Sequence, residues 1–243
     1  MRDVAEARNF NKNSPWYFTG LSILIITIWN IPNGFWYLYP FTIIATYFHE
    51  MGHGLAAFLL GADFKYLVIN PDGSGVAVHS GAVYFGRFGY ALIAIAGPLG
   101  PTIAGMLLVL ASSSQKATKS LLIVLGVFII ISVIIWVRSV FGVIFLVVLG
   151  LLLIIIGAKA NDKFKQFMLQ LMGVSAMLSL YQSVGYFFME SAEINGEIIL
   201  SDTGYLQKYL WLPHWFWAVL IIGISIWAFY FSFRHLFKKN KGL

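Results

Sequence analysis

Long apolar stretches are the feature that most constrains this chain. A helix needs about 20 mostly apolar residues to cross the hydrocarbon core of a bilayer. The 243-residue chain is 59% hydrophobic and only 11% charged, whereas soluble domains are about 45–50% apolar and about 25% charged. The sequence therefore predicts an all-α polytopic membrane protein with about six to seven transmembrane helices. The candidate spans lie near residues 16–30 (short), 39–60, 88–111, 119–137, 139–157, 165–189 and 213–233.

A β-rich region interrupts this pattern after the second predicted helix. Residues 64–69 and 75–79 consist largely of strand-forming residues, and the Asn-Pro-Asp-Gly-Ser segment between them is a strong turn signal. We expect a β-hairpin at the membrane face or dipping into it, as an insertion of residues 61–87 into a single domain over 1–243. The polar segment 1–15 lacks the basic-then-apolar form of a cleaved signal, and residues 234–243 form a basic tail.

The formal net charge of +6 sits in short loops and in the tail, a placement typical of charge that orients a membrane protein. This placement argues against a nucleic-acid partner. One side, expected to be cytoplasmic, would hold the tail and Lys116, Lys119, Lys159, Lys163 and Lys165. The other side would hold the hairpin, the chain's N-terminus, and a polar loop with Glu190, Glu193 and Glu197.

The second predicted span contains the motif His49-Glu50-Met51-Gly52-His53. Residues i and i+4 share one face of a helix, with Cβ atoms about 5–6 Å apart, so the two imidazoles can bind one Zn²⁺ ion. Glu50 would then take a proton from a water that the ion activates. The alternative is a pair of neutral histidines hydrogen-bonded between helices. A charged residue mid-span costs about 2.5–3.5 kcal/mol, so a function for these residues is favoured.

The absence of cysteine excludes a thiolate zinc site and a cysteine nucleophile. Any metal must therefore be held by His, Asp or Glu.

The HExxH motif and three other segments of the chain resemble the site-2 protease family of intramembrane zinc metalloproteases. The matching segments are 48–54 with its HExxH motif, the Ala96-Gly97-Pro98-Leu99 segment, and the 71–75 and 201–217 regions, which are similar to a compact bacterial branch. The resemblance implies a bacterial membrane protease with zinc held by two histidines and one aspartate, and a glutamate that activates water. One position departs from it: Pro101 stands where the family's GPxxN pattern has asparagine.

Two aspartates compete for the place of third ligand. Asp72 lies in the predicted turn, where aspartate caps and glycine takes positive φ, so we interpret it as a turn residue. Asp202 precedes the last predicted span, and the topology returns it to the side where the HExxH helix ends. We therefore expect His49, His53 and Asp202 as metal ligands, with a fourth position open to water. A helix N-cap at Ser201 or Asp202 remains the alternative.

Other polar residues point less directly to the site. His79 could reach it from the hairpin but is more simply a solvated strand residue, and one of the loop glutamates could contact a ligand. His214 with Trp215-Phe216-Trp217 is typical of an interfacial anchor, and Arg138 of a side chain that extends to the membrane face.

The sequence thus predicts a zinc endopeptidase that cleaves membrane-embedded or membrane-proximal proteins or peptides in contact with the lipid bilayer. Two alternatives remain open: a membrane zinc-binding relative without proteolytic activity, and a metal transporter. Transporters tend to show inverted repeats, which are not visible in this sequence.

Overall fold

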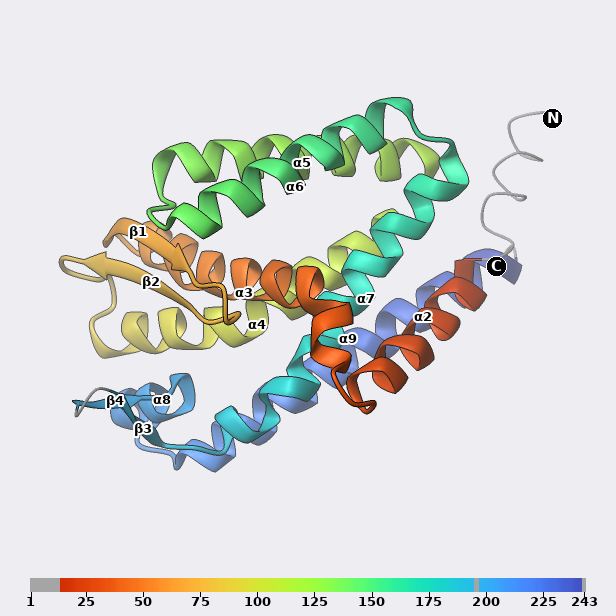
Figure 1. Cartoon of the computed structure of the whole chain (residues 1–243). Helices are drawn as coiled ribbons and strands as arrows, with labels where there is room; N and C mark the ends of the chain where they lie inside the picture. Colours follow the sequence, from red (N-terminus) through yellow and green to blue (C-terminus); the bar gives the residue numbers. More distant parts are fainter. Residues whose placement is uncertain (1–13, 195–196, 242–243) are drawn as a thin grey trace.

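The protein is described by a computed structural model over residues 14–194 and 197–241, which excludes most of the polar segment 1–15 (Figure 1). This part of the chain forms eight α-helices and two β-hairpins. The helices are α2 (Ser14–Trp29), α3 (Gly34–Leu59), α4 (Arg87–Ala111), α5 (Gln115–Ile135), α6 (Val140–Lys159), α7 (Asp162–Phe187), α8 (Asp202–Leu210) and α9 (His214–Lys241). The hairpins are β1 (Asp63–Ile69) with β2 (Gly75–Ser80), and β3 (Ser191–Ile194) with β4 (Glu197–Leu200).

Five of these helices, α4, α5, α6, α7 and α9, are long and apolar enough to cross a membrane. The apolar α2 has 16 residues. The 26 residues of α3 extend about 39 Å, and they carry the two histidines and the glutamate of the motif. The all-α polytopic membrane fold is therefore confirmed. Helix α9 continues through Arg234 to Lys241, so most of the predicted basic tail belongs to its last turns.

The first two helices together run from one end of the bundle to the other. Ser14 at the start of α2 accepts a hydrogen bond from Gln170 Nε2 at 2.6 Å, and Trp16 contacts the Phe237 ring of α9. The break between α2 and α3 contains Asn33 at φ 62°, and α3 ends beside the first hairpin at the opposite end (Figure 1). The prediction that the chain begins on the hairpin side is therefore wrong for the start of α2, because α2 and α3 make a single passage.

Helices α5 and α6 form an antiparallel pair that packs through glycines (Figure 1). A Cβ atom added at Gly126 would lie 2.6 Å from the Gly150 carbonyl oxygen, and one at Gly150 would lie 2.9 Å from the Gly126 oxygen. Small residues allow two helix backbones to approach this closely where water provides no driving force between helices.

We expect Gly150→Leu to destabilise the protein by about 1–3 kcal/mol, because the added side chain overpacks the α5–α6 contact. Thermal unfolding in detergent should show a lower Tm. Gly20→Leu is the matched control, since a Cβ at Gly20 meets no atom within 4 Å. An equal loss of stability in both variants would contradict this account of the packing.

The predicted first hairpin is confirmed, and one of its edges is covered. Strands β1 and β2 are antiparallel, with Leu67 opposite Ala77. The outer edge of β1 pairs with the α5–α6 connection, where Leu67 N donates to Trp136 O and Arg138 N to Leu67 O, both at 2.9 Å. Within the described residues β2 has no second strand beside it, and at its other edge the backbone of Ala77 bonds to the Glu50 side chain.

The polar loop predicted around Glu190, Glu193 and Glu197 is instead a second hairpin followed by the short helix α8. Strands β3 and β4 pair from Ser191 opposite Leu200 to Ile194 opposite Glu197. The sequence signal for this hairpin is the Asn-Gly pair at 195–196 between two short runs, a pair typical of two-residue hairpin turns. Asp202 consequently starts α8, one helix before the last span.

Candidate metal centre

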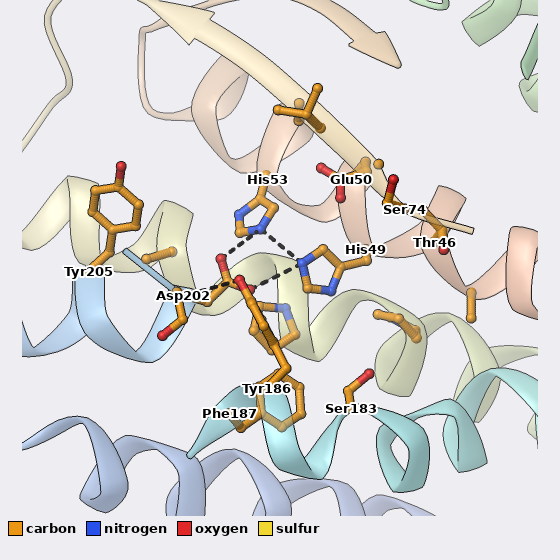
Figure 2. Close-up of a pocket in the computed structure, with 18 of the residues that line it drawn as sticks. Thr46, His49, Glu50, His53, Ser74, Ser183, Tyr186, Phe187, Asp202 and Tyr205 are labelled. Atoms are coloured by element: carbon orange, nitrogen blue, oxygen red, sulfur yellow. Dashed lines mark hydrogen bonds and ion pairs between the residues drawn. The ribbon is translucent and has the colours of Figure 1, made fainter. Parts of the chain in front are cut away.

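His49 and His53 occupy one face of α3, in its second half. Their Nε2 atoms are 3.1 Å apart, and their ring centroids 4.9 Å apart. This is the geometry expected from a spacing of four residues on a helix. Both nitrogens point to the same spot beneath the first hairpin (Figure 2).

Asp202 faces the same spot from α8. Its Oδ1 lies 3.2 Å from His53 Nε2, and its Oδ2 lies 3.2 Å from His49 Nε2. Ser201 is the cap of α8, because its Oγ accepts a hydrogen bond from Gly204 N at 3.0 Å. The sequence left open whether this segment supplies a metal ligand or a helix N-cap, and the structure contains both. Ser201 caps the helix, and the Asp202 carboxylate faces the histidines.

These three donor groups fit a Zn²⁺ ion. Atoms bound tetrahedrally about 2.0–2.1 Å from an ion lie about 3.3 Å from one another, close to the 3.1–3.2 Å separations measured here. Asp202 is buried, and both of its carboxylate oxygens face the imidazoles. An anionic carboxylate facing two ring nitrogens is a suitable environment for a cation. Among the described residues, these three form the cluster able to hold a metal.

Helix α4 orients His53. The Nδ1 atom of His53 lies 2.8 Å from the carbonyl oxygen of Ile93. A carbonyl oxygen only accepts hydrogen bonds, so Nδ1 carries the proton and the Nε2 lone pair faces the cluster. Hydrogen bonds of this kind fix the tautomer and the ring orientation of metal-binding histidines.

Glu50 is buried beside the three candidate ligands and lies under the first hairpin. A Cβ added at Gly75 of β2 would come within 2.8 Å of the Glu50 Cγ atom, so the strand passes directly over this side chain. The hairpin is held there by hydrogen bonds from α3: Thr46 Oγ1 donates to Gly73 O at 2.6 Å, and Tyr39 Oη to Pro71 O at 2.5 Å.

A cavity of about 820 Å³ opens at the cluster. Its lining comes from α3, β2, α4, α7, both strands of the second hairpin, and α8, and it includes His49, Glu50, His53 and Asp202. Figure 2 shows these side chains around a common space, with Glu50 and Tyr186 on opposite sides of the three candidate ligands. The cavity is large enough to admit water and part of a peptide chain.

The structure assigns the remaining polar candidates to other places. Asp72 is a turn residue: its Oδ1 accepts hydrogen bonds from Ser74 N and Oγ at 2.9 and 2.7 Å, which lower the pKa of Asp72. His79 lines the cavity but lies outside the ligand cluster. Glu190 contacts α8 and not the cluster, since its Oε1 accepts a hydrogen bond from Gln207 Nε2 at 2.7 Å.

A family model described as Peptidase M50B-like matches residues 18–232, which is most of the chain. The chain belongs to this family. The Peptidase M50B-like family is the site-2 protease family, so the resemblance seen in the sequence is confirmed, and membership implies a membrane protease. No curated protein and no solved structure matches the chain.

The Ala96-Gly97-Pro98 motif of this Peptidase M50B-like chain lies inside α4, with both Pro98 and Pro101 within the helix. Gly97 packs against the cluster, since a Cβ there would lie 2.0 Å from His53 Nε2. Two residues beside the cluster were missed in the sequence: Gly97, whose contact required the α3–α4 packing to be known, and Tyr186, which no motif distinguished.

Proposed function

We propose that this protein is an intramembrane zinc endopeptidase in which His49, His53 and Asp202 hold the ion and Glu50 is the general base. The observation that carries the proposal is the convergence of three donor groups, two imidazoles and one carboxylate, whose atoms lie 3.1–3.2 Å apart beside a buried glutamate. Three protein ligands with an open fourth position are typical of catalytic zinc, whereas structural sites have four.

Zinc supplies two things when bound: it lowers the pKa of a coordinating water toward about 7, and it polarises a carbonyl group. The chain supplies the rest. Glu50 accepts the proton of the attacking water and passes it to the leaving amine nitrogen. Asp202 and the two imidazoles would hold the ion at the cavity.

The substrate in this proposal is a membrane-embedded or membrane-proximal protein or peptide in an extended conformation. The edge of β2 that faces away from β1 can pair with such a segment, and edge pairing of this kind is a common mode of peptide recognition. Gly75, Val76 and Ala77 of β2 line the cavity, so a segment paired there would lie close to Glu50. Following the resemblance, we place the protein in a bacterial cell membrane.

The alternatives receive less support. A zinc-binding relative without proteolysis has no need of a buried glutamate beside an open coordination position. A transporter requires ligands spread along a path, whereas the described cluster is confined to one spot between α3 and α8. We therefore keep proteolysis as the proposed function.

Metal removal tests this function. The purified protein in detergent should cleave fluorescein-labelled casein, an unfolded general protease substrate, and treatment with 1,10-phenanthroline should reduce the rate about tenfold or more, because the activated water is lost. Removing the chelator and adding ZnCl₂ should restore the rate, while MgCl₂ should not. Cleavage that continues unchanged in a preparation shown to be free of metal would contradict the proposal.

A further inference from the structure

Tyr186 places a phenol hydroxyl at the ligand cluster. It lies next to the last residue of α7, and its side chain extends into the cavity toward Asp202 (Figure 2). The Tyr186 oxygen accepts a hydrogen bond from Asp202 N at 3.2 Å. The residue is 42% exposed and lines the cavity.

Six serine and threonine hydroxyls around the cavity are occupied elsewhere, while the side chains of Tyr90, Tyr205 and Tyr209 also line it. Those of serine and threonine bond to backbone carbonyls or to each other: Thr42 to Leu38, Thr46 to Gly73, Thr102 to Ser225, Ser179 to Ala176, Ser183 to Ser179 and Ser201 to Met189. Pro98 and Pro101 also line it, and proline has no backbone N–H. The Tyr186 oxygen receives a hydrogen bond from Asp202 N, and its hydroxyl also lies within hydrogen-bonding reach of the Asp202 carboxylate, so its own proton is directed at the cluster.

Peptide hydrolysis needs such a donor. As the water oxygen adds to the carbonyl carbon, the C=O π electrons move to the carbonyl oxygen, which becomes negatively charged. Glu50 takes the water proton, and the C–N bond then breaks as that proton passes to the nitrogen. A donor aimed at the developing oxyanion lowers the barrier, and removal of one such donor typically costs about 100- to 1,000-fold in kcat.

We propose that the Tyr186 hydroxyl binds the carbonyl oxygen of the scissile peptide bond and donates its hydrogen bond to the oxyanion. This inference rests on the proposed function and adds a substrate-contacting residue to it. Glu50 and Tyr186 lie on opposite sides of the cluster (Figure 2), so the base and the donor can act on a carbonyl held between them. His79, which also lines the cavity, is the competing donor.

Tyr186→Phe tests the assignment, with Tyr181→Phe as the matched control, because Tyr181 lies on the same helix and bonds to Asn30 outside the cavity. With fluorescein-labelled casein, we expect kcat of Tyr186→Phe to fall about 100-fold and KM to change less than about threefold, at an unchanged zinc content. A kcat within about threefold of the wild type would overturn the assignment. Loss of zinc from Tyr186→Phe would also overturn it, because Tyr186 would then be a positioning residue for Asp202. So would a kcat loss of about 100-fold in His79→Ala when Tyr186→Phe shows none.

A binding measurement keeps the inference separate from the proposed function. A fluorescein-labelled phosphinic peptide, which carries a tetrahedral anionic centre, should bind Tyr186→Phe about tenfold or more weakly than the wild type, whereas the corresponding amide peptide should bind both equally. This comparison does not depend on turnover. If the wild type cleaves nothing, the proposed function fails while the phosphinic peptide still decides on Tyr186; equal affinity for both proteins overturns the assignment.

Discussion

Glu50→Gln is expected to lower kcat by about 100- to 10,000-fold, the range for loss of a general base, while the protein retains its zinc. Glutamine has nearly the same shape as glutamate, so the packing under Gly75 is preserved. It cannot accept the proton of the attacking water. Casein turnover measured together with zinc content by mass spectrometry checks both parts of this expectation.

The matched control for this substitution is Glu190→Gln. Glu190 accepts a hydrogen bond from Gln207 of α8, and a glutamine oxygen can accept the same bond. We expect its turnover to equal that of the wild type. A zinc-loaded Glu50→Gln protein with undiminished turnover would remove Glu50 from the role of base.

Gly97→Ala is expected to abolish zinc binding and to lower activity by about 100-fold or more. The added methyl group would lie 2.0 Å from His53 Nε2 and 2.3 Å from its Cε1. The imidazole must therefore turn away from the cluster, and a displacement of about 1 Å in a catalytic group can cost about 100-fold. Zinc content and casein turnover are the measurements.

Gly223→Ala provides the control for the same chemical change elsewhere. Gly223 lies in α9, and a Cβ there meets no atom within 4 Å, so zinc content and turnover should match the wild type. A Gly97→Ala protein that binds zinc with wild-type stoichiometry would show that His53 does not need the space beside α4.

The sequence predicted the parts of the site that depend on local spacing. His49 and His53 lie four residues apart on one helix, and helix geometry alone brings them together. Asp202 was reached by counting crossings, a long-range argument that succeeded because α3 and α8 meet at one end of the bundle. The Asp72 turn was predictable because its side chain bonds only within the turn.

The parts that were missed depend on packing between helices. Nothing local distinguishes Tyr186 from the other tyrosines; its position beside Asp202 follows from the contact of α7 with α8. Helix α2 was predicted as a short separate span whose crossing its composition did not decide, and the break at Asn33 joins it to α3 in one passage. The second hairpin was missed because its glutamates, taken by themselves, point to a polar loop.

The most direct test of the account is the zinc content of the purified protein and of two aspartate variants. We predict one zinc ion per chain in the wild type and in Asp72→Asn, because Asp72 bonds within its turn, and a large loss of zinc in Asp202→Asn, because the carboxylate facing both histidines is gone. A wild-type protein that remains free of zinc after incubation with excess ZnCl₂, or zinc lost from Asp72→Asn and kept by Asp202→Asn, would contradict the account.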